Sequence, residues 1–267
     1  MTRRTLIASV ALSLAAAFAQ AGPAGPVIEA QLLPGWRLAD GSHMAGLRLT
    51  LAPGWKTYWR APGDAGIPPR FDWRGSDNLR DVQVEWPVPE VFDQNGMRSV
   101  VYSDDVILPL HVMPAAAGAV ALQARIELGV CQDICIPAAV AISGELTADG
   151  AGPDPRIAAA LAARPYSADE AGVRAVACQV SPIEGGLRLA ATVDMPRAGQ
   201  VEAAVIETAD PHVWVSEPDM SRTGSRITAV SKLMHVDGTA FALDRTGVRI
   251  TMLGGEQAVD IQGCPAP

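Results

Sequence analysis

Short apolar stretches separated by turn residues run along most of the chain. Many of them alternate apolar and polar positions, the pattern of a strand with one buried face. Glycine, proline, asparagine and aspartate fall between them and favour turns. In the first half, the stretches predict strands at residues 44–51, 100–102, 106–112, 120–128 and 138–146. In the second half, they predict strands at residues 173–180, 187–193, 201–206, 213–215, 226–230, 240–243, 248–253 and 258–261.

A break in this pattern divides the chain into two halves. Residues 149–155 read Asp-Gly-Ala-Gly-Pro-Asp-Pro, a composition typical of a linker. The alanine-rich residues 157–164 predict a short helix that ends before Pro165. Since strands at this spacing without intervening helices favour antiparallel sandwiches, we expect an all-β protein of two immunoglobulin-like β-sandwich domains. We place the first domain at residues 22–149, the linker with its helix at 150–170 and the second domain at 171–267.

The N-terminus has the parts of an export signal. Two arginines precede an apolar run over residues 6–18, and Ala19-Gln20-Ala21 supplies small residues for cleavage before Gly22. The run is too short to span a bilayer. We therefore expect a cleaved signal peptide over residues 1–21; the alternative is that the run forms a buried core helix.

Charge narrows the range of partners. Without residues 1–21 the chain carries 19 lysines and arginines against 29 aspartates and glutamates, a net charge of −10. Such a surface repels nucleic acid and anionic lipid. No later stretch approaches the roughly 20 apolar residues that a membrane helix needs. We expect a soluble mature protein that binds no nucleic acid, does not insert into a membrane and can keep disulfides in an oxidising compartment.

Four cysteines carry most of the chemical information. They allow three pairings, and domain membership favours Cys131 with Cys135 and Cys178 with Cys264. In the chain-entropy model, the five-residue loop of the first bond contributes ~2 kcal/mol of stability, and the 87-residue loop of the second contributes ~4.6 kcal/mol. The difference corresponds to roughly 50 mV in reduction potential. The short bond is therefore predicted to be reversible and the long bond to be a structural disulfide.

The short Cys-x-x-x-Cys pair requires a turn. Four extended steps would separate the two Cα atoms by about 13 Å, whereas a disulfide needs roughly 4.4–6.8 Å. Residues 132–134 must reverse direction, in a loop between strand 120–128 and the strand after Pro137, and Pro137 is expected to end the ladder there. A partner's thiol can reach an exposed loop. The alternatives are a purely structural clip, a thiolate metal site and two reduced, inert core cysteines.

The neighbours of the pair indicate how it would react. No lysine, arginine or histidine adjoins Cys131 or Cys135 in the sequence, and Asp133 between them disfavours a thiolate. The pair is better suited to attack by a partner's low-pKa thiolate than to act as a nucleophile alone. We expect no cofactor and no metal site.

Five segments between Leu47 and Pro137 form a specific combination of motifs. They are residues 53–59 (PGWKTYW), 62–69 (PGDAGIPP), 86–89 (WPVP), 102–109 (YSDDVILP) and 129–137 (GVCQDICIP). Together they resemble the N-terminal periplasmic domain of DsbD-type thiol:disulfide interchange proteins, especially the ScsB-like branch. Any one of these segments alone would be a weak signal.

The resemblance implies an immunoglobulin-like, periplasmic thiol:disulfide oxidoreductase, one component of a protein-disulfide reductase system, with a reversible pair at Cys131 and Cys135. Members of the family take electrons from a membrane-embedded hub through a thioredoxin-like domain and pass them to oxidised thioredoxin-fold partners. Full-length relatives carry both parts in one chain. Here we expect a separate membrane electron carrier and thioredoxin-fold periplasmic proteins to supply them.

The resemblance also points to a candidate cap. The best-studied members space their cysteines more widely and shield them with an aromatic residue just before a glycine that aligns with Gly96. Phe92 is the aromatic candidate for this cap in the present chain. The Cys-x-x-x-Cys spacing fits the ScsB-like branch better.

The alternative function is a copper-tolerance or structural binding module whose cysteines only stabilise the fold. It rests on the association of the ScsB-like branch with copper tolerance and on scattered histidines and methionines. Trp55, Tyr58 and Trp59 would suit a sugar-binding platform, although core packing is the commoner use of such residues. The four histidines are His43, His111, His212 and His235.

Overall fold

The computed structural model describes residues 25–267 except residues 64–65, 95–96, 148–151 and 256. The expected signal peptide, Gly96 and part of the expected linker lie outside the described residues. The described part of the chain forms nineteen strands and one helix, which confirms the all-β class. None of its helices is long and apolar enough to cross a membrane.

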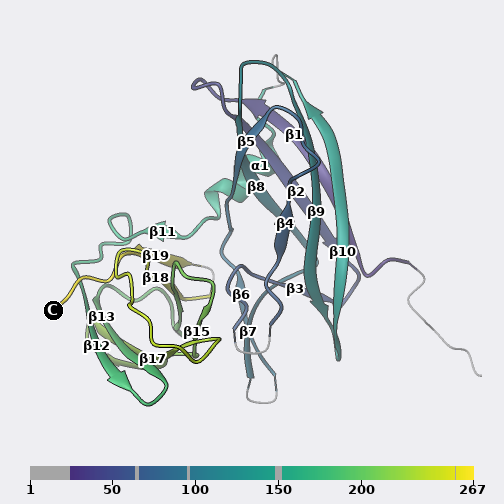
Figure 1. Ribbon diagram of the computed structural model, residues 1–267. Helices are drawn as coiled ribbons and strands as arrows, with labels where there is room; N and C mark the ends of the chain where they lie inside the picture. The colour runs from purple at the N-terminus through teal and green to yellow at the C-terminus, as the bar shows by residue number, and fades with distance from the viewer. Residues whose placement is uncertain (1–24, 64–65, 95–96, 148–151, 256) are drawn as a thin grey trace, which may run out of the picture.

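Strands β1 to β10 form what we call the N-terminal unit (Figure 1). In the described residues one sheet has the order β1-β2-β8-β5, and the other has the order β10-β9-β3-β7-β6 with β4 paired to β9. The two sheets face each other as an antiparallel sandwich. The strands are β1 (Ile28–Arg37), β2 (His43–Leu51), β3 (Lys56–Tyr58), β4 (Arg70–Asp72), β5 (Leu79–Val84), β6 (Glu90–Gln94), β7 (Met97–Ser103), β8 (Asp105–Pro114), β9 (Val120–Cys131) and β10 (Cys135–Leu146).

The core of the N-terminal unit follows from strand periodicity. Every second residue of β9 from Val120 to Leu128 is buried, and the intervening residues are exposed. These side chains pack with buried Leu47 and Leu108 of the facing sheet and with Trp59, which is fully buried. Core packing therefore accounts for Trp59.

Strands β11 to β19 form what we call the C-terminal unit, and helix α1 lies in the connection that precedes it. Over the described residues its sheets have the orders β11-β19-β18-β14 and β12-β13-β17-β15, with β16 paired to β17. The two sheets of this unit enclose a second core. The elements are α1 (Pro155–Ala162), β11 (Tyr166–Ser167), β12 (Ala175–Ile183), β13 (Gly186–Asp194), β14 (Ala203–Glu207), β15 (Val213–Val215), β16 (Asp219–Thr223), β17 (Arg226–His235), β18 (Arg249–Leu253) and β19 (Ala258–Gln262).

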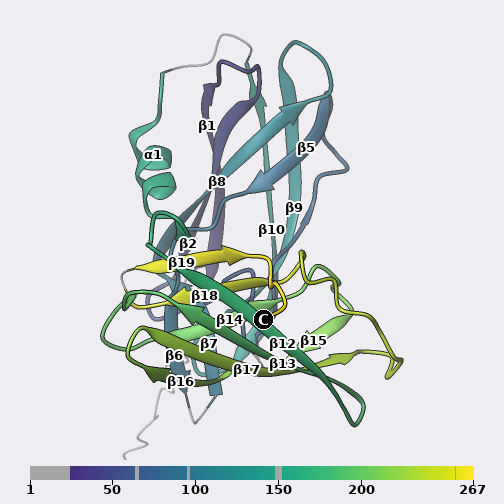
Figure 2. The ribbon, with the colours of Figure 1, turned by 90° about the vertical axis from the view of Figure 1, so that its left-hand side faces the viewer.

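Helix α1 lies against the N-terminal unit beside β1 and β8 (Figure 2). Its N-cap is Asp154, whose side chain accepts a hydrogen bond from the backbone N–H of Arg156, and Pro155 occupies the first turn. Ile157 is fully buried and packs with Leu33. The sequence predicts this helix at residues 157–164, and the helix itself begins two residues earlier, at Pro155.

Other predictions differ from the structure. The expected strand at 240–243 is absent from the described ladders, because Phe241 and Leu243 pack against the core without backbone pairing. Tyr166–Ser167 falls in the expected linker but pairs in parallel with β19. The division into domains at the expected boundaries stays a prediction.

The two units share a buried contact. Ala203, Leu253 and Ala258 of the C-terminal unit belong to the same apolar cluster as the core of the N-terminal unit. In Figures 1 and 2 the C-terminal unit lies beside the end of the N-terminal sandwich that carries β6 and β7.

Candidate functional site

The β9–β10 hairpin brings Cys131 and Cys135 together. Cys131 ends β9, Cys135 begins β10, and the two are paired in the antiparallel register with Cα atoms 4.1 Å apart. They form a disulfide, which we call the hairpin disulfide. Gln132 donates its backbone N–H to the carbonyl of Ile134 across the turn, 3.3 Å away. The chain reverses at the residues that the sequence indicates.

Pro137 does not end the ladder, contrary to the sequence-based expectation. It lies inside β10 and pairs with Gly129 of β9. The short Cα separation at the cysteines is typical of an antiparallel pair that exchanges no backbone hydrogen bonds, and Pro137 is two positions further along the strand. A residue in such a pair needs no N–H toward its neighbour, so β10 accepts proline at the edge of the sheet.

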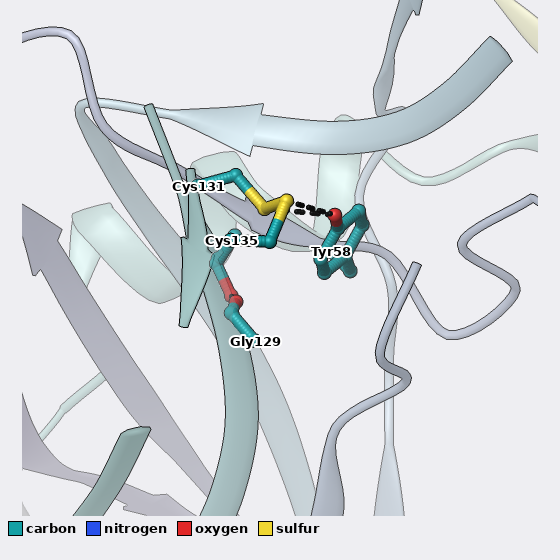
Figure 3. Close-up of a disulfide and its surroundings, with 5 residues drawn as sticks. Tyr58, Gly129, Cys131 and Cys135 are labelled. Atoms are coloured by element: carbon teal, nitrogen blue, oxygen red, sulfur yellow. Dashed lines mark hydrogen bonds between the residues drawn. A yellow bond between two sulfur atoms is a disulfide. The ribbon is translucent and has the colours of Figure 1, made fainter. Parts of the chain in front are cut away.

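Tyr58 contacts both sulfurs, a contact that the sequence did not predict. Its hydroxyl lies 2.8 Å from Sγ of Cys131 and 3.1 Å from Sγ of Cys135 (Figure 3). Since disulfide sulfurs carry no hydrogen, the tyrosine donates. Burial raises the pKa of the Tyr58 hydroxyl above its ordinary value, so it keeps its proton at neutral pH.

Two glycines make room for the Tyr58 ring. A Cβ added at Gly129 would lie 2.9 Å from the ring and 2.8 Å from Cβ of Ile67, and one at Gly66 would lie 2.8 Å from the ring. The hydroxyl of Thr57 donates a 2.9 Å hydrogen bond to the carbonyl of Gly129. The ring is therefore held between β9 and the segment after residue 65, with its hydroxyl directed at the sulfurs.

A basic residue lies opposite Cys131 on the neighbouring strand. Strand β3 pairs with β9, and Lys56 lies opposite Cys131 in that register. The absence of basic neighbours therefore holds only along the sequence. The Lys56 ammonium lies 4.4 Å from the ring centroid of Phe92, the candidate cap. That contact joins Phe92 to the residue opposite Cys131, and the role of Phe92 as a cap stays a prediction.

The hairpin disulfide is accessible and has apolar surroundings. Cys135 is exposed and Cys131 is partly exposed. Ile134 in the turn is 73% exposed, and Ile136 and Ile67 are 38% and 39% exposed. Exposed isoleucines beside an exposed disulfide favour contact with a partner protein. We call these three residues the isoleucine rim.

The second disulfide has the opposite environment. Cys178 of β12 and Cys264 after β19 are bonded and almost completely buried, so we call this bond the buried disulfide. Arg245 donates hydrogen bonds to the carbonyls of both cysteines, at 2.7 and 3.2 Å. A partner thiolate could not reach these sulfurs in the folded protein.

The histidines lie in two separate places. His43 is buried and bonds the carbonyl of Pro34 at 2.6 Å, while His111 bonds the hydroxyl of Ser42. The rings of His212 and His235 stack with centroids 5.9 Å apart in the other unit. Across the described residues, no three histidine, cysteine or acidic side chains converge as a metal site.

Comparison with known proteins gives a consistent result. The family model described as "Thiol:disulfide interchange protein DsbD, N-terminal" matches residues 29–145. The crystal structure of the N-terminal periplasmic domain of ScsB from Proteus mirabilis is 19% identical, with a TM-score of 0.65 over 90% of this chain and 92% of that one. That ScsB domain and this chain therefore share their fold over both units.

The Neisseria meningitidis DsbD N-terminal domain in the reduced form matches at 16% identity and a TM-score of 0.27, over 46% of this chain and 90% of that one. No curated protein sequence matches the chain.

Proposed function

Because residues 29–145 are a DsbD-type N-terminal domain, we propose that the protein exchanges dithiol for disulfide with thioredoxin-fold partners through the hairpin disulfide. The observation that carries this proposal is the contrast between the two disulfides. One lies at an exposed turn with a tyrosine hydroxyl on its sulfurs, and the other is buried. Only the first is accessible to exchange.

Reduction begins at Cys135, the more exposed of the two cysteine residues. A partner thiolate attacks Sγ of Cys135, the S–S bond breaks, and Sγ of Cys131 leaves as a thiolate. The Tyr58 hydroxyl, already 2.8 Å from that sulfur, donates a hydrogen bond that becomes stronger as negative charge develops.

The second half of the exchange restores two separate proteins. The partner's other thiolate attacks its own sulfur in the mixed disulfide and displaces Cys135. The partner leaves with a disulfide, while Cys131 and Cys135 keep two electrons and take up two protons. The same steps in reverse pass those electrons to an oxidised partner, which makes the domain a relay.

The proposed setting is the periplasm. A membrane-associated thioredoxin-like donor would reduce the hairpin disulfide, and thioredoxin-fold acceptors would oxidise it. The family match and the fold shared with a periplasmic domain support this setting. The protein would then be an oxidoreductase that depends on separate proteins for both half-reactions.

Trapping the mixed disulfide tests the proposal. Cys131→Ser leaves the exposed Cys135 without its resolving partner, so reaction with an oxidised thioredoxin-fold protein should accumulate a covalent complex visible on a non-reducing gel. Cys135→Ser leaves only the less exposed sulfur and should accumulate much less. Absence of a covalent complex with either variant would contradict the relay.

A further inference from the structure

An ion pair joins the two units close to the redox site. Arg60 follows Tyr58 by two residues, and its guanidinium makes a bidentate contact with Glu207 of β14 at 3.0–3.2 Å. The same guanidinium donates a 3.0 Å hydrogen bond to the hydroxyl of Thr251 in β18. Only 11% of the Arg60 side chain and 22% of the Glu207 side chain are exposed.

The segment between Tyr58 and this ion pair is held firmly. The Arg60 guanidinium lies 3.7 Å from the ring centroid of Trp59, a fully buried residue. The backbone N–H of Trp59 donates to the carbonyl of Val100 at 2.9 Å, and the N–H of Val100 donates to the carbonyl of Pro62 at 3.0 Å. A displacement of Arg60 would therefore be transmitted to the end of β3.

A second ion pair reaches the neighbouring strand. Arg98 of β7 lies 2.7 Å from Glu217 of the C-terminal unit. Strand β7 pairs with β3, and Val101 lies opposite Tyr58 in that register. The segment that follows β3 and the neighbouring strand β7 are thus each bonded to the C-terminal unit.

The Arg60–Glu207 ion pair is largely buried, so the loss of one charge strongly affects the other. Desolvation lowers the pKa of Arg60 from its ordinary value, although the guanidinium stays charged, and Glu207 compensates that loss of hydration. Removing the carboxylate leaves a charge with few other partners in a confined place. The guanidinium would then shift toward solvent or another partner, and this shift would displace the end of β3.

We propose that Glu207 of the C-terminal unit, acting through Arg60, is a positioning residue for Tyr58 at the hairpin disulfide. The C-terminal unit then has a defined role, which is to keep the tyrosine hydroxyl on the sulfurs. This inference rests on the proposed exchange at that disulfide. The hydroxyl stabilises the thiolate more than the disulfide, so a displaced tyrosine makes reduction less favourable.

Equilibration with dithiothreitol tests the inference without any partner protein. Glu207→Gln should lower the equilibrium constant for reduction of the hairpin disulfide about threefold, a modest coupling between connected residues. Glu207→Asp should restore part of the loss. The matched control is Asp105→Asn, which breaks a bidentate ion pair with Arg48 in the other sheet and should leave the constant unchanged.

A double-mutant cycle shows whether the effect passes through Tyr58. In a Tyr58→Phe background, Glu207→Gln should have no further effect on the equilibrium constant. An unchanged constant in the single variant, or an equal effect in both backgrounds, would overturn the inference. If Glu207→Gln fails to fold, Arg60→Lys, which keeps the charge but loses the bidentate contact, is interpreted in the same way.

The outcomes separate this inference from the proposed function. A wild-type protein that equilibrates with dithiothreitol but never forms a mixed disulfide with a thioredoxin-fold protein contradicts the relay alone. A wild-type protein that exchanges with such a partner, combined with a Glu207→Gln variant whose constant and exchange rate are unchanged, contradicts the positioning role alone.

Discussion

The hydroxyl of Tyr58 lies 2.8 Å from the sulfur of Cys131, although 73 positions separate the two residues in the sequence. The contact exists because β3 pairs with β9 and places Thr57 opposite Val130. A phenol on a disulfide is a proton-carrying group at the place where a thiolate would form in the proposed exchange. Its removal is therefore the most direct test of the site.

Tyr58→Phe should raise the pKa of the leaving thiol by about one unit, because a hydrogen bond to a charged sulfur is lost. The rate of iodoacetamide alkylation of the reduced protein as a function of pH measures this pKa. Tyr166→Phe is the control, since Tyr166 is 45% exposed in β11. The wild-type phenol is protonated below its raised pKa, so the difference should be full at neutral pH and disappear in strong alkali. Identical profiles would exclude Tyr58 from the chemistry.

The two disulfides should be reduced at different potentials. The hairpin disulfide is exposed and closes a short loop, whereas the buried disulfide closes a long one, so we expect the first to reduce at a potential roughly 50 mV higher. Titration against glutathione or dithiothreitol buffers, with mass-spectrometric mapping of each pair, measures both values. Simultaneous reduction of the two bonds would contradict the assignment of one exchanging and one structural bond.

Loss of each disulfide should affect stability differently. Cys178→Ala with Cys264→Ala should lower the free energy of unfolding by ~4–5 kcal/mol, and Cys131→Ala with Cys135→Ala by only ~2 kcal/mol. Urea unfolding followed by tryptophan fluorescence measures both losses. A larger loss from the hairpin pair would favour the structural clip.

Gly129→Ala should disturb the site through packing alone. The new Cβ would contact the Tyr58 ring and Ile67 closer than van der Waals distance, so we expect a loss of about 1–3 kcal/mol in stability and slower exchange. Gly152→Ala is the control, because its added Cβ meets nothing within 4 Å. Urea unfolding and exchange rates together measure the effect; a fully wild-type Gly129→Ala would show that the ring is not confined.

The isoleucine rim should matter to partners and not to small thiols. Ile134→Ser should lower the rate of exchange with a thioredoxin-fold protein several-fold while leaving the equilibrium with dithiothreitol unchanged, since the residue is apolar and 73% exposed. Val201→Ser, at 83% exposure in the C-terminal unit, is the matched control. Stopped-flow fluorescence gives both rates. An equal effect on dithiothreitol would mean that Ile134 acts on the sulfurs directly.

The alternation of apolar and polar residues was enough to predict the strands in which this alternation is regular. Strand β9 alternates over its whole first part, and the prediction at 120–128 is confirmed and extended to Cys131. The hairpin turn also follows from two cysteines with three residues between them. By contrast, β3 has only three residues, Lys56, Thr57 and Tyr58, which are too few to show an alternating pattern.

The residues that surround the cysteines in space could not be predicted in the same way. Tyr58 and Lys56 reach the site through the β3–β9 register, a long-range pairing that no local pattern encodes. The available signal was the position of both residues inside a family motif beside a core tryptophan. Glu207 lies still further away in sequence, and its contact with Arg60 depends on how the two units pack.

Pro137 limits how another chain can approach the redox site. Strand β10 is an outer strand, and its backbone would otherwise offer a template for an incoming strand from a second protein. Two positions from Cys135, the proline ring occupies the outward place where an N–H donor would stand. The missing donor disfavours strand addition beside the disulfide, so the proposed partner would have to dock through side chains, and the same missing donor protects the exposed edge from growing into aggregates.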